Sequence, residues 1–210
     1  MRGFTSASAI FLSLLVARPG EAAGGATDEV RALWVTRFEY QTAADVRTIV
    51  ANSAALGFIT ILFKVRGQAD AYYRSEIEPW AERLGGRDPG FDPLEVACRE
   101  SKRHGIKLHA WINTMPAWRG MGPPQDRTHI AHRRPDWIVT GRDGRRQPFN
   151  DHYVALNPCL PEVRDYVASV VRDIVSRYEV DGLHLDYVRF IEGDWSFDAK
   201  TLRLFRAASE

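Results

Sequence analysis

The segment DGLHLDYVRF, residues 181–190, places two ionisable side chains at alternate positions of an otherwise Leu-rich strand pattern. Successive strand residues point to opposite faces, so His184 and Asp186 share one face and lie one strand repeat, about 6.6 Å, apart. A carboxylate is costly to bury without partners. Asp186 is therefore expected either to belong to a structural ion-pair network or to perform acid–base or nucleophilic chemistry at the end of its strand.

Two earlier segments repeat this alternation of apolar and polar faces. In FITILFKVR, residues 58–66, and in IKLHAWIN, residues 106–113, one face is uniformly apolar. That face must lie under helices, so the opposite face is predicted to be the interior of the fold. The side chains expected to converge there with His184 and Asp186 are Lys64, Arg66, His109, Trp111 and Asn113.

The elements that must position these residues alternate along the chain. Strand patterns cover residues 31–37, 58–66, 106–113 and 181–190, and helical patterns cover residues 42–57, 92–105 and 161–178. The first helix begins with the capping-box pair Thr42 and Asp45, and the second with Asp92 followed by Pro93. This alternation indicates parallel strands joined by right-handed crossovers, in a barrel or in an open doubly wound sheet.

The lengths of the connections favour the barrel. Helix-to-strand links are a few residues long, whereas the strand-to-helix links cover residues 67–91 and 114–160. Long insertions after the strands are typical of the active-site face of a (β/α) barrel, and no glycine-rich phosphate fingerprint follows the first strand. We therefore predict an α/β fold, a (β/α) TIM-type barrel. A whole barrel typically needs about 250 residues, so we expect only its first four units here, in a chain truncated at the C-terminus.

The bulk properties indicate an exported globular protein. Residues 1–22 have the positive start, short apolar run and small-residue exit of a signal peptide, which leaves a barrel domain at residues 28–210 and no transmembrane segment. Removing the leader would change the net charge from +1 to zero, so no nucleic-acid partner is indicated. Cys98 and Cys159 could form a disulfide in a secreted protein, although Cys98 is predicted to be a buried free thiol on the inner face of its helix.

A carboxylate at the mouth of a polar barrel, in an exported protein with aromatic-rich loops, suggests glycoside hydrolysis by a pair of carboxyl groups. The aromatic rings suit two roles equally, because they can stack on sugar faces or seal the long loops onto the scaffold. The loop tryptophans are Trp80, Trp118, Trp137 and Trp195.

Several blocks of the chain together resemble a known family. They include RALWVTR, VRGQADAYYRSEIEPW, HGIKLHAWIN, HRRPDWI, LNPCLPEVRDYV and VDGLHLDYVRF, and they run in order from about residue 29 to the end. They are similar to the bacterial glycosyl hydrolase-like 10 family. The resemblance implies a TIM-type barrel in exported proteins, action on glycosidic bonds and a catalytic acidic residue at the end of the fourth strand, which is Asp186 here. Lys64 stands where the family pattern suggests Gln, which would alter the charge beside the site.

The leading interpretation is a glycoside hydrolase-like protein that acts on an extracellular or cell-envelope polysaccharide or oligosaccharide without a cofactor. Asp186 is the predicted catalytic residue. The predicted substrate-binding residues are Arg66, Asp70, Tyr73, His109, Trp111, Asn113, Asn157, His184, Tyr187 and Arg189.

Two alternatives remain open from the sequence. One is a metal-dependent hydrolase in which His109, His184 and Asp186 form a facial metal site. The other is a carbohydrate-binding half barrel without turnover.

Overall fold

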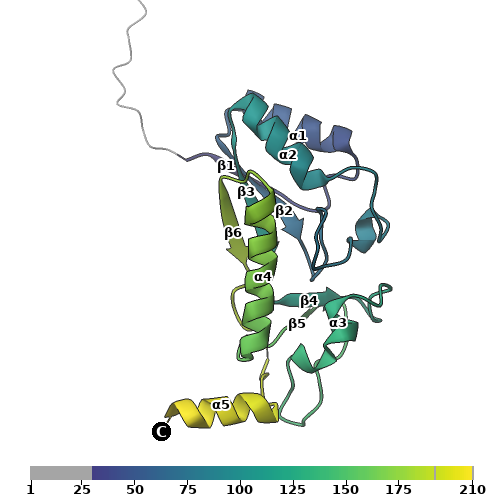
Figure 1. Cartoon of the computed structure of the whole chain (residues 1–210), viewed down its shortest axis with the longest axis vertical. Coiled ribbons are helices and arrows are strands. Elements are labelled where there is room, and N and C mark those ends of the chain that lie inside the picture. The colour runs from purple at the N-terminus through teal and green to yellow at the C-terminus, as the bar shows by residue number, and fades with distance from the viewer. Residues whose placement is uncertain (1–29, 192, 210) are drawn as a thin grey trace, which may run out of the picture.

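The fold is a four-stranded parallel sheet with a helix in each connection (Figure 1). The structure is a computed structural model and describes residues 30–191 and 193–209, so the predicted leader at residues 1–22 lies outside the described residues. The sheet has the order β1-β2-β3-β6, which follows the order of these strands along the chain. This topology confirms the prediction of the first four units of a (β/α) barrel.

The strands and helices follow the predicted segments closely. The four parallel strands are β1 (Ala32–Val35), β2 (Thr60–Arg66), β3 (Lys107–Asn113) and β6 (Gly182–Asp186). The helices between and after them are α1 (Ala43–Ala55), α2 (Pro93–His104), α4 (Pro161–Arg177) and α5 (Ala199–Ser209). The loops contain the 3₁₀ turns η1 (Glu82–Leu84) and η2 (Pro135–Trp137), the short helix α3 (Ile130–Arg133), and the strands β4 (Pro116–Arg119) and β5 (Tyr153–Ala155).

Local capping explains where two helices begin. The Thr42 hydroxyl accepts a hydrogen bond from the Asp45 backbone N–H, and the Asp45 carboxylate accepts one from the Thr42 N–H, which completes the predicted capping box. Asp92 caps α2 by accepting from two backbone N–H groups, with Pro93 at the first helical position. Gly105 ends α2 with φ of 67°, a left-handed conformation that glycine adopts without strain.

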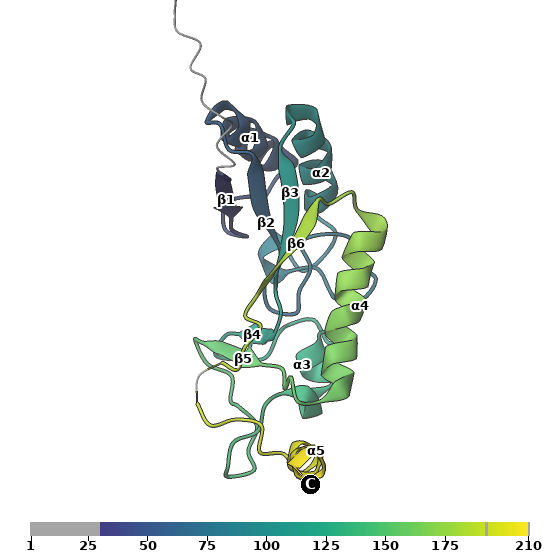
Figure 2. The same ribbon diagram turned by 90° about the vertical axis from the view of Figure 1, so that its left-hand side faces the viewer.

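The apolar faces of the strands pack under the helices, as their alternation predicts. Figure 2 shows α1, α2 and α4 arranged along the sheet. The largest buried cluster combines strand residues such as Phe63 and Leu108 with Val46 of α1, Leu94 of α2 and Ile174 of α4. The polar faces of the strands are therefore directed away from these helices, toward the side that would be a barrel interior.

The long connection after β3 builds a smaller unit of its own. β4 and β5 pair in antiparallel fashion, and a second buried cluster lies beneath them against the N-terminal part of α4. Trp118 and Trp137 are both buried in this region, so these two loop tryptophans seal the loop onto the scaffold. The strand pair was not predicted from the sequence, because each of its strands has only three or four residues.

The two cysteines are free thiols, so the possible disulfide between Cys98 and Cys159 is not formed. Both are half-buried, and burial raises the pKa of the Cys98 thiol to about 12. Within the described ranges, none of the helices has the length and apolar character needed to cross a membrane.

Candidate active site

The inner face of the sheet carries an aromatic cluster beside a carboxylate. Trp34 of β1, Trp111 of β3 and His184 of β6 contact one another, with ring centroids 5.8 to 6.4 Å apart. Trp111 also donates a hydrogen bond from Nε1 to Oδ2 of Asp186, at 3.1 Å. His184 and Asp186 therefore share the inner face with Lys64 and Trp111, as the strand alternation predicts.

Asp186 is held at the carboxyl end of β6. Its Oδ1 accepts a hydrogen bond from the backbone N–H of Tyr187 at 2.8 Å, and its Oδ2 lies 3.7 Å from the Lys64 ammonium. The Asp186 side chain remains 36% exposed, whereas that of Lys64 is 4% exposed. The carboxylate is thus fixed by three neighbours and still accessible from the inner side of the sheet.

Lys64 is the cation of this cluster. Its ammonium lies 3.3 Å from the centroid of the Trp111 ring and donates a hydrogen bond to the side-chain oxygen of Asn113. Burial lowers the pKa of Lys64 from 10.5 to about 7, although the nearby Asp186 carboxylate acts in the opposite direction. Near neutral pH this lysine can therefore exist in both its charged and its neutral form.

The residue after Asp186 adopts an unusual backbone conformation. Tyr187 has φ of 54°, a left-handed value that is strained for a bulky side chain. This turn brings the Tyr187 ring to 5.2 Å from that of Tyr153, in an edge-on contact. Both rings line a cavity of about 320 Å³, which is also lined by Gln147, Asn150, His152, Arg189, Ile191 and Trp195.

This cavity is chemically suited to a sugar. Aromatic rings pack against the apolar faces of sugar rings, while amide, imidazole and guanidinium groups hydrogen-bond to hydroxyls. Of the predicted substrate-binding residues, Tyr187 and Arg189 line it, and the Arg189 guanidinium lies 5.1 Å from the centre of the Tyr187 ring. His184, Trp111 and Asn113 lie nearby on the strands that end at this face.

Arg66 is not on the inner face, and that part of the prediction is wrong. A β-bulge lies between Lys64 and Arg66, so Lys64 pairs with Trp111 whereas Arg66 pairs with Ile112. The additional residue turns Arg66 to the helix-covered side of the sheet.

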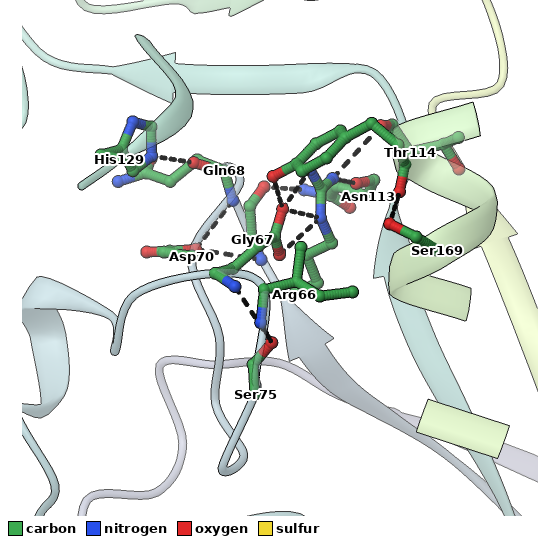
Figure 3. Close-up of polar contacts among 12 residues, drawn as sticks. Arg66, Gly67, Gln68, Asp70, Ser75, Asn113, Thr114, His129 and Ser169 are labelled. Carbon is green, nitrogen blue, oxygen red and sulfur yellow. Dashed lines mark hydrogen bonds and ion pairs between the residues drawn. The ribbon is translucent and has the colours of Figure 1, made fainter. Parts of the chain in front are cut away.

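There Arg66 forms a fully buried ion pair with Glu78, with 2.8 Å between Nη2 and Oε1, and Tyr166 of α4 donates a hydrogen bond to the same carboxylate. Arg66 also donates to the backbone oxygens of Asn113 and Thr114 (Figure 3). Its contacts in this structure connect the loop after β2 to β3 and α4.

Three other predicted binding residues hold loops together. Asp70 is buried and accepts hydrogen bonds from the N–H groups of Gly67 and Gln68 (Figure 3). Tyr73 is buried against Tyr178 of α4.

Asn157 is also buried, and its amide donates to Asp198 and to Thr201, both at 2.8 Å. These contacts attach the loop after β5 to the start of α5. The structure therefore does not bring Tyr73 or Asn157 to the inner face of the sheet.

The three residues of the metal-site alternative do not come together. His109 pairs with Gly182, so it lies two strand repeats, about 13 Å, below Asp186 along the sheet. His184 lies between these two levels and packs against two tryptophans. Among the described residues, no group of three or more His, Cys, Asp or Glu side chains is placed to hold a metal ion. The facial site of this alternative is therefore not formed.

Trp34 and Tyr153 were not identified from the sequence. Trp34 lies in the four-residue strand β1, where it alternates with the core residues Leu33 and Val35, so its inward direction was visible in the pattern RALWVTR. Tyr153 lies far along a loop, and no local pattern places its hydroxyl 3.1 Å from Arg37 and 3.4 Å from Asn113.

Comparison with known proteins gives a consistent result. The family model for Glycosyl hydrolase-like 10 matches residues 29–209. The chain is similar to Glycosyl hydrolase DigH of Escherichia coli (strain K12), with 32% identity over 170 residues that cover 73% of this chain and 36% of the relative. It is also similar to Glycosyl hydrolase YngK of Bacillus subtilis (strain 168), with 29% identity over 138 residues that cover 62% of this chain and 25% of the relative. The chain thus spans about a third or less of the length of these relatives.

Solved structures support the fold. A hypothetical protein from Ruminiclostridium thermocellum has a TM-score of 0.60 and 14% identity, over 84% of this chain and 90% of that one. The α-galactosidase AgaB from Geobacillus stearothermophilus has a TM-score of 0.55 and 14% identity, over 86% of this chain and 26% of that one. The structural neighbours include TIM-barrel glycosidases, so the described sheet is part of an α/β barrel.

Proposed function

Because this chain belongs to the glycosyl hydrolase-like 10 family, we propose that it hydrolyses a glycosidic bond in an extracellular or cell-envelope polysaccharide, with Asp186 as a catalytic carboxylate. The observation that supports this role is the position of Asp186. It ends the fourth parallel strand, remains accessible on the inner side of the sheet and lies next to an aromatic-lined cavity. Catalytic residues of (β/α) barrels occupy this end of the strands.

The neighbours of Asp186 suit a carboxylate anion. In its ammonium form Lys64 supplies a positive charge, and Trp111 supplies a hydrogen-bond donor, both directed at Oδ2, while Oδ1 accepts from the backbone. Glycosidases use such an anion to attack the sugar or to stabilise the positive charge that develops on it in the transition state. We assign Asp186 this role, rather than that of the group that protonates the leaving oxygen.

A hydrolysis assay tests the proposal. The purified protein is incubated with polysaccharides, and new reducing ends are measured for the wild type, for Asp186→Asn and for the control Asp165→Asn on the exposed side of α4. The Asp186 variant is expected to lose activity by about 100-fold or more, since it can no longer supply the anion. The control is expected to keep full activity.

Full activity in the Asp186 variant would contradict the assignment. Saturable polysaccharide binding by the wild type without any new reducing ends would contradict hydrolysis and would instead favour the carbohydrate-binding alternative. The aromatic cavity beside Tyr187 is the feature that such a binding protein would use.

A further inference from the structure

A second cavity, of about 430 Å³, lies at the same end of the sheet and is lined by three arginines. Arg37 follows β1, Arg83 belongs to η1 and Arg119 ends β4. Tyr153, which lines the first cavity, is uncharged and contacts two of these arginines. Its hydroxyl accepts from Arg37 at 3.1 Å, and its ring lies 6.0 Å from the Arg119 guanidinium.

The arginines are held in place by neutral groups. The guanidinium carbons of Arg37 and Arg83 lie 4.7 and 5.0 Å from the centre of the Phe38 ring. Arg83 also donates hydrogen bonds to the backbone oxygens of Arg37 and Phe38, both at 3.0 Å, and Arg119 donates to the backbone oxygen of Asp151 at 2.6 Å. Arg37 is itself 7% exposed, so its charge is fixed within the protein.

The positive charge of the cavity exceeds its negative charge, because three arginines and two acidic residues line it. Over residues 30–191 and 193–209, no carboxylate lies within 4 Å of the nitrogens of Arg37, Arg83 or Arg119, although these residues contribute three charges. Two acidic residues line the cavity. Asp70 directs Oδ1 to backbone N–H groups and burial raises the pKa of its carboxyl, while its charge also interacts with that of Arg37. Asp151 is exposed and lies 3.6 Å from His152.

We propose that this cavity binds an anionic substituent of a glycan, either a carboxylate or a sulfate ester. Guanidinium groups present forked N–H donors that match the oxygens of such anions. Phe38 is 56% exposed and lines the same cavity, so the edge of its ring adds apolar surface beside the guanidinium groups for the sugar that carries the charge. The inference rests on the proposed function only in taking the ligand to be a glycan.

Binding measurements on the purified protein test this inference without requiring turnover. The probes are tri-galacturonate, its methyl ester and a sulfated disaccharide, each titrated calorimetrically at low salt. The test variant is Arg83→Gln/Arg119→Gln, in which both altered side chains are exposed. The matched control is Arg127→Gln/Arg203→Gln, which removes the same charge from exposed positions elsewhere.

The wild type and the control are expected to bind at least one charged probe about ten-fold more tightly than the ester, as expected for one charge-assisted hydrogen bond. The test variant is expected to lose this preference, and 0.5 M salt is expected to weaken it in the wild type because the cavity is open to solvent. A preference for one charged probe over the other would identify the anion as a carboxylate or as a sulfate ester.

Equal binding of the ester and both charged probes, or a preference that survives in the test variant, would overturn the inference. If inorganic sulfate alone bound as tightly as the charged probes, the proposal that the ligand is a glycan would be overturned. Asp186→Asn is expected to leave the preference unchanged, so a failure of the hydrolysis proposal would be distinguished from a failure of this one.

Discussion

Replacing Asp186 with Asn is expected to lower the pKa of Lys64 further below its wild-type value of about 7. In the wild type the Asp186 carboxylate raises this pKa against the larger effect of burial. The amide of the variant keeps the shape and hydrogen-bonding capacity of the side chain but removes its negative charge. The ammonium form of Lys64 would then lose its only anionic neighbour within 4 Å among the described residues.

The magnitude follows from the 3.7 Å separation between Nζ and Oδ2. Two unit charges at that distance attract by about 1 kcal/mol in bulk water and by about 4 kcal/mol at an effective dielectric constant of about 20. Because the Asp186 side chain is 36% exposed, solvent screening keeps the value near the lower limit, at about 1–2 kcal/mol. Since about 1.4 kcal/mol corresponds to one pH unit, the expected change is about one unit.

The assay is carbon-13 NMR of the lysine Cε atoms across a pH titration. The chain has four lysines, Lys64, Lys102, Lys107 and Lys200, so the resonances can be assigned with single substitutions. Lys102 is an internal control, because its pKa is raised by Glu179, 2.9 Å away on the surface. Glu179→Gln should therefore lower the pKa of Lys102 and leave that of Lys64 unchanged.

A wild-type Lys64 that titrated near 10.5 would contradict this prediction, since its ammonium group would then not be desolvated. The prediction would also be contradicted if the Asp186 variant left the midpoint of Lys64 unchanged or raised it. Either result would mean that the inner face of the sheet is more open to water than its burial indicates.

Three stability predictions can be checked by urea unfolding. Lys64→Met should stabilise the protein more at pH 6 than at pH 9, and the difference should reach up to about 3 kcal/mol. The reason is that the Lys64 ammonium loses its proton near pH 7 in the folded wild type but only near 10.5 in the unfolded chain. An equal effect at both pH values would contradict this prediction. Gly182→Ala should lower the free energy of unfolding by about 1–3 kcal/mol, because the new Cβ would lie 2.9 Å from the His109 ring. Adding His109→Ala should restore most of this stability, and no recovery would show that the strain lies elsewhere. Glu78→Gln should cost about 3–5 kcal/mol by leaving the Arg66 charge buried without its partner, and a loss below about 1 kcal/mol would show that water reaches the pair.

Much of the fold was predictable because its signals are local. The caps at Thr42 and Asp92 begin helices by hydrogen bonds within one turn, and Gly105 ends one by its own conformation. The alternation in β2, β3 and β6 depends only on the two-residue repeat of a strand. These patterns correctly placed Asp186 and His184 on the face opposite the helices.

The errors in the candidate site arise where the contacts are long-range. A single additional residue in β2 moves Arg66 to the other face of the sheet, and nothing in the sequence of that strand marks the bulge. Tyr73 and Asn157 have side chains that suit sugar binding, yet Tyr73 packs against Tyr178 and Asn157 bonds to Asp198, each more than 35 residues away in sequence. The metal-site alternative failed because the register between β3 and β6 places His109 opposite Gly182.

Local sequence patterns are enough to predict the parallel β/α alternation, the helix boundaries and the face on which Asp186 lies, because each depends on the periodicity and capping of a short segment. The polar residues that share a site are instead selected by how the folded segments pack together. The bulge in β2, the register of β3 against β6 and the course of the loop that carries Tyr153 and Arg119 set those distances. They depend on packing between segments that are distant in sequence, which no local pattern records.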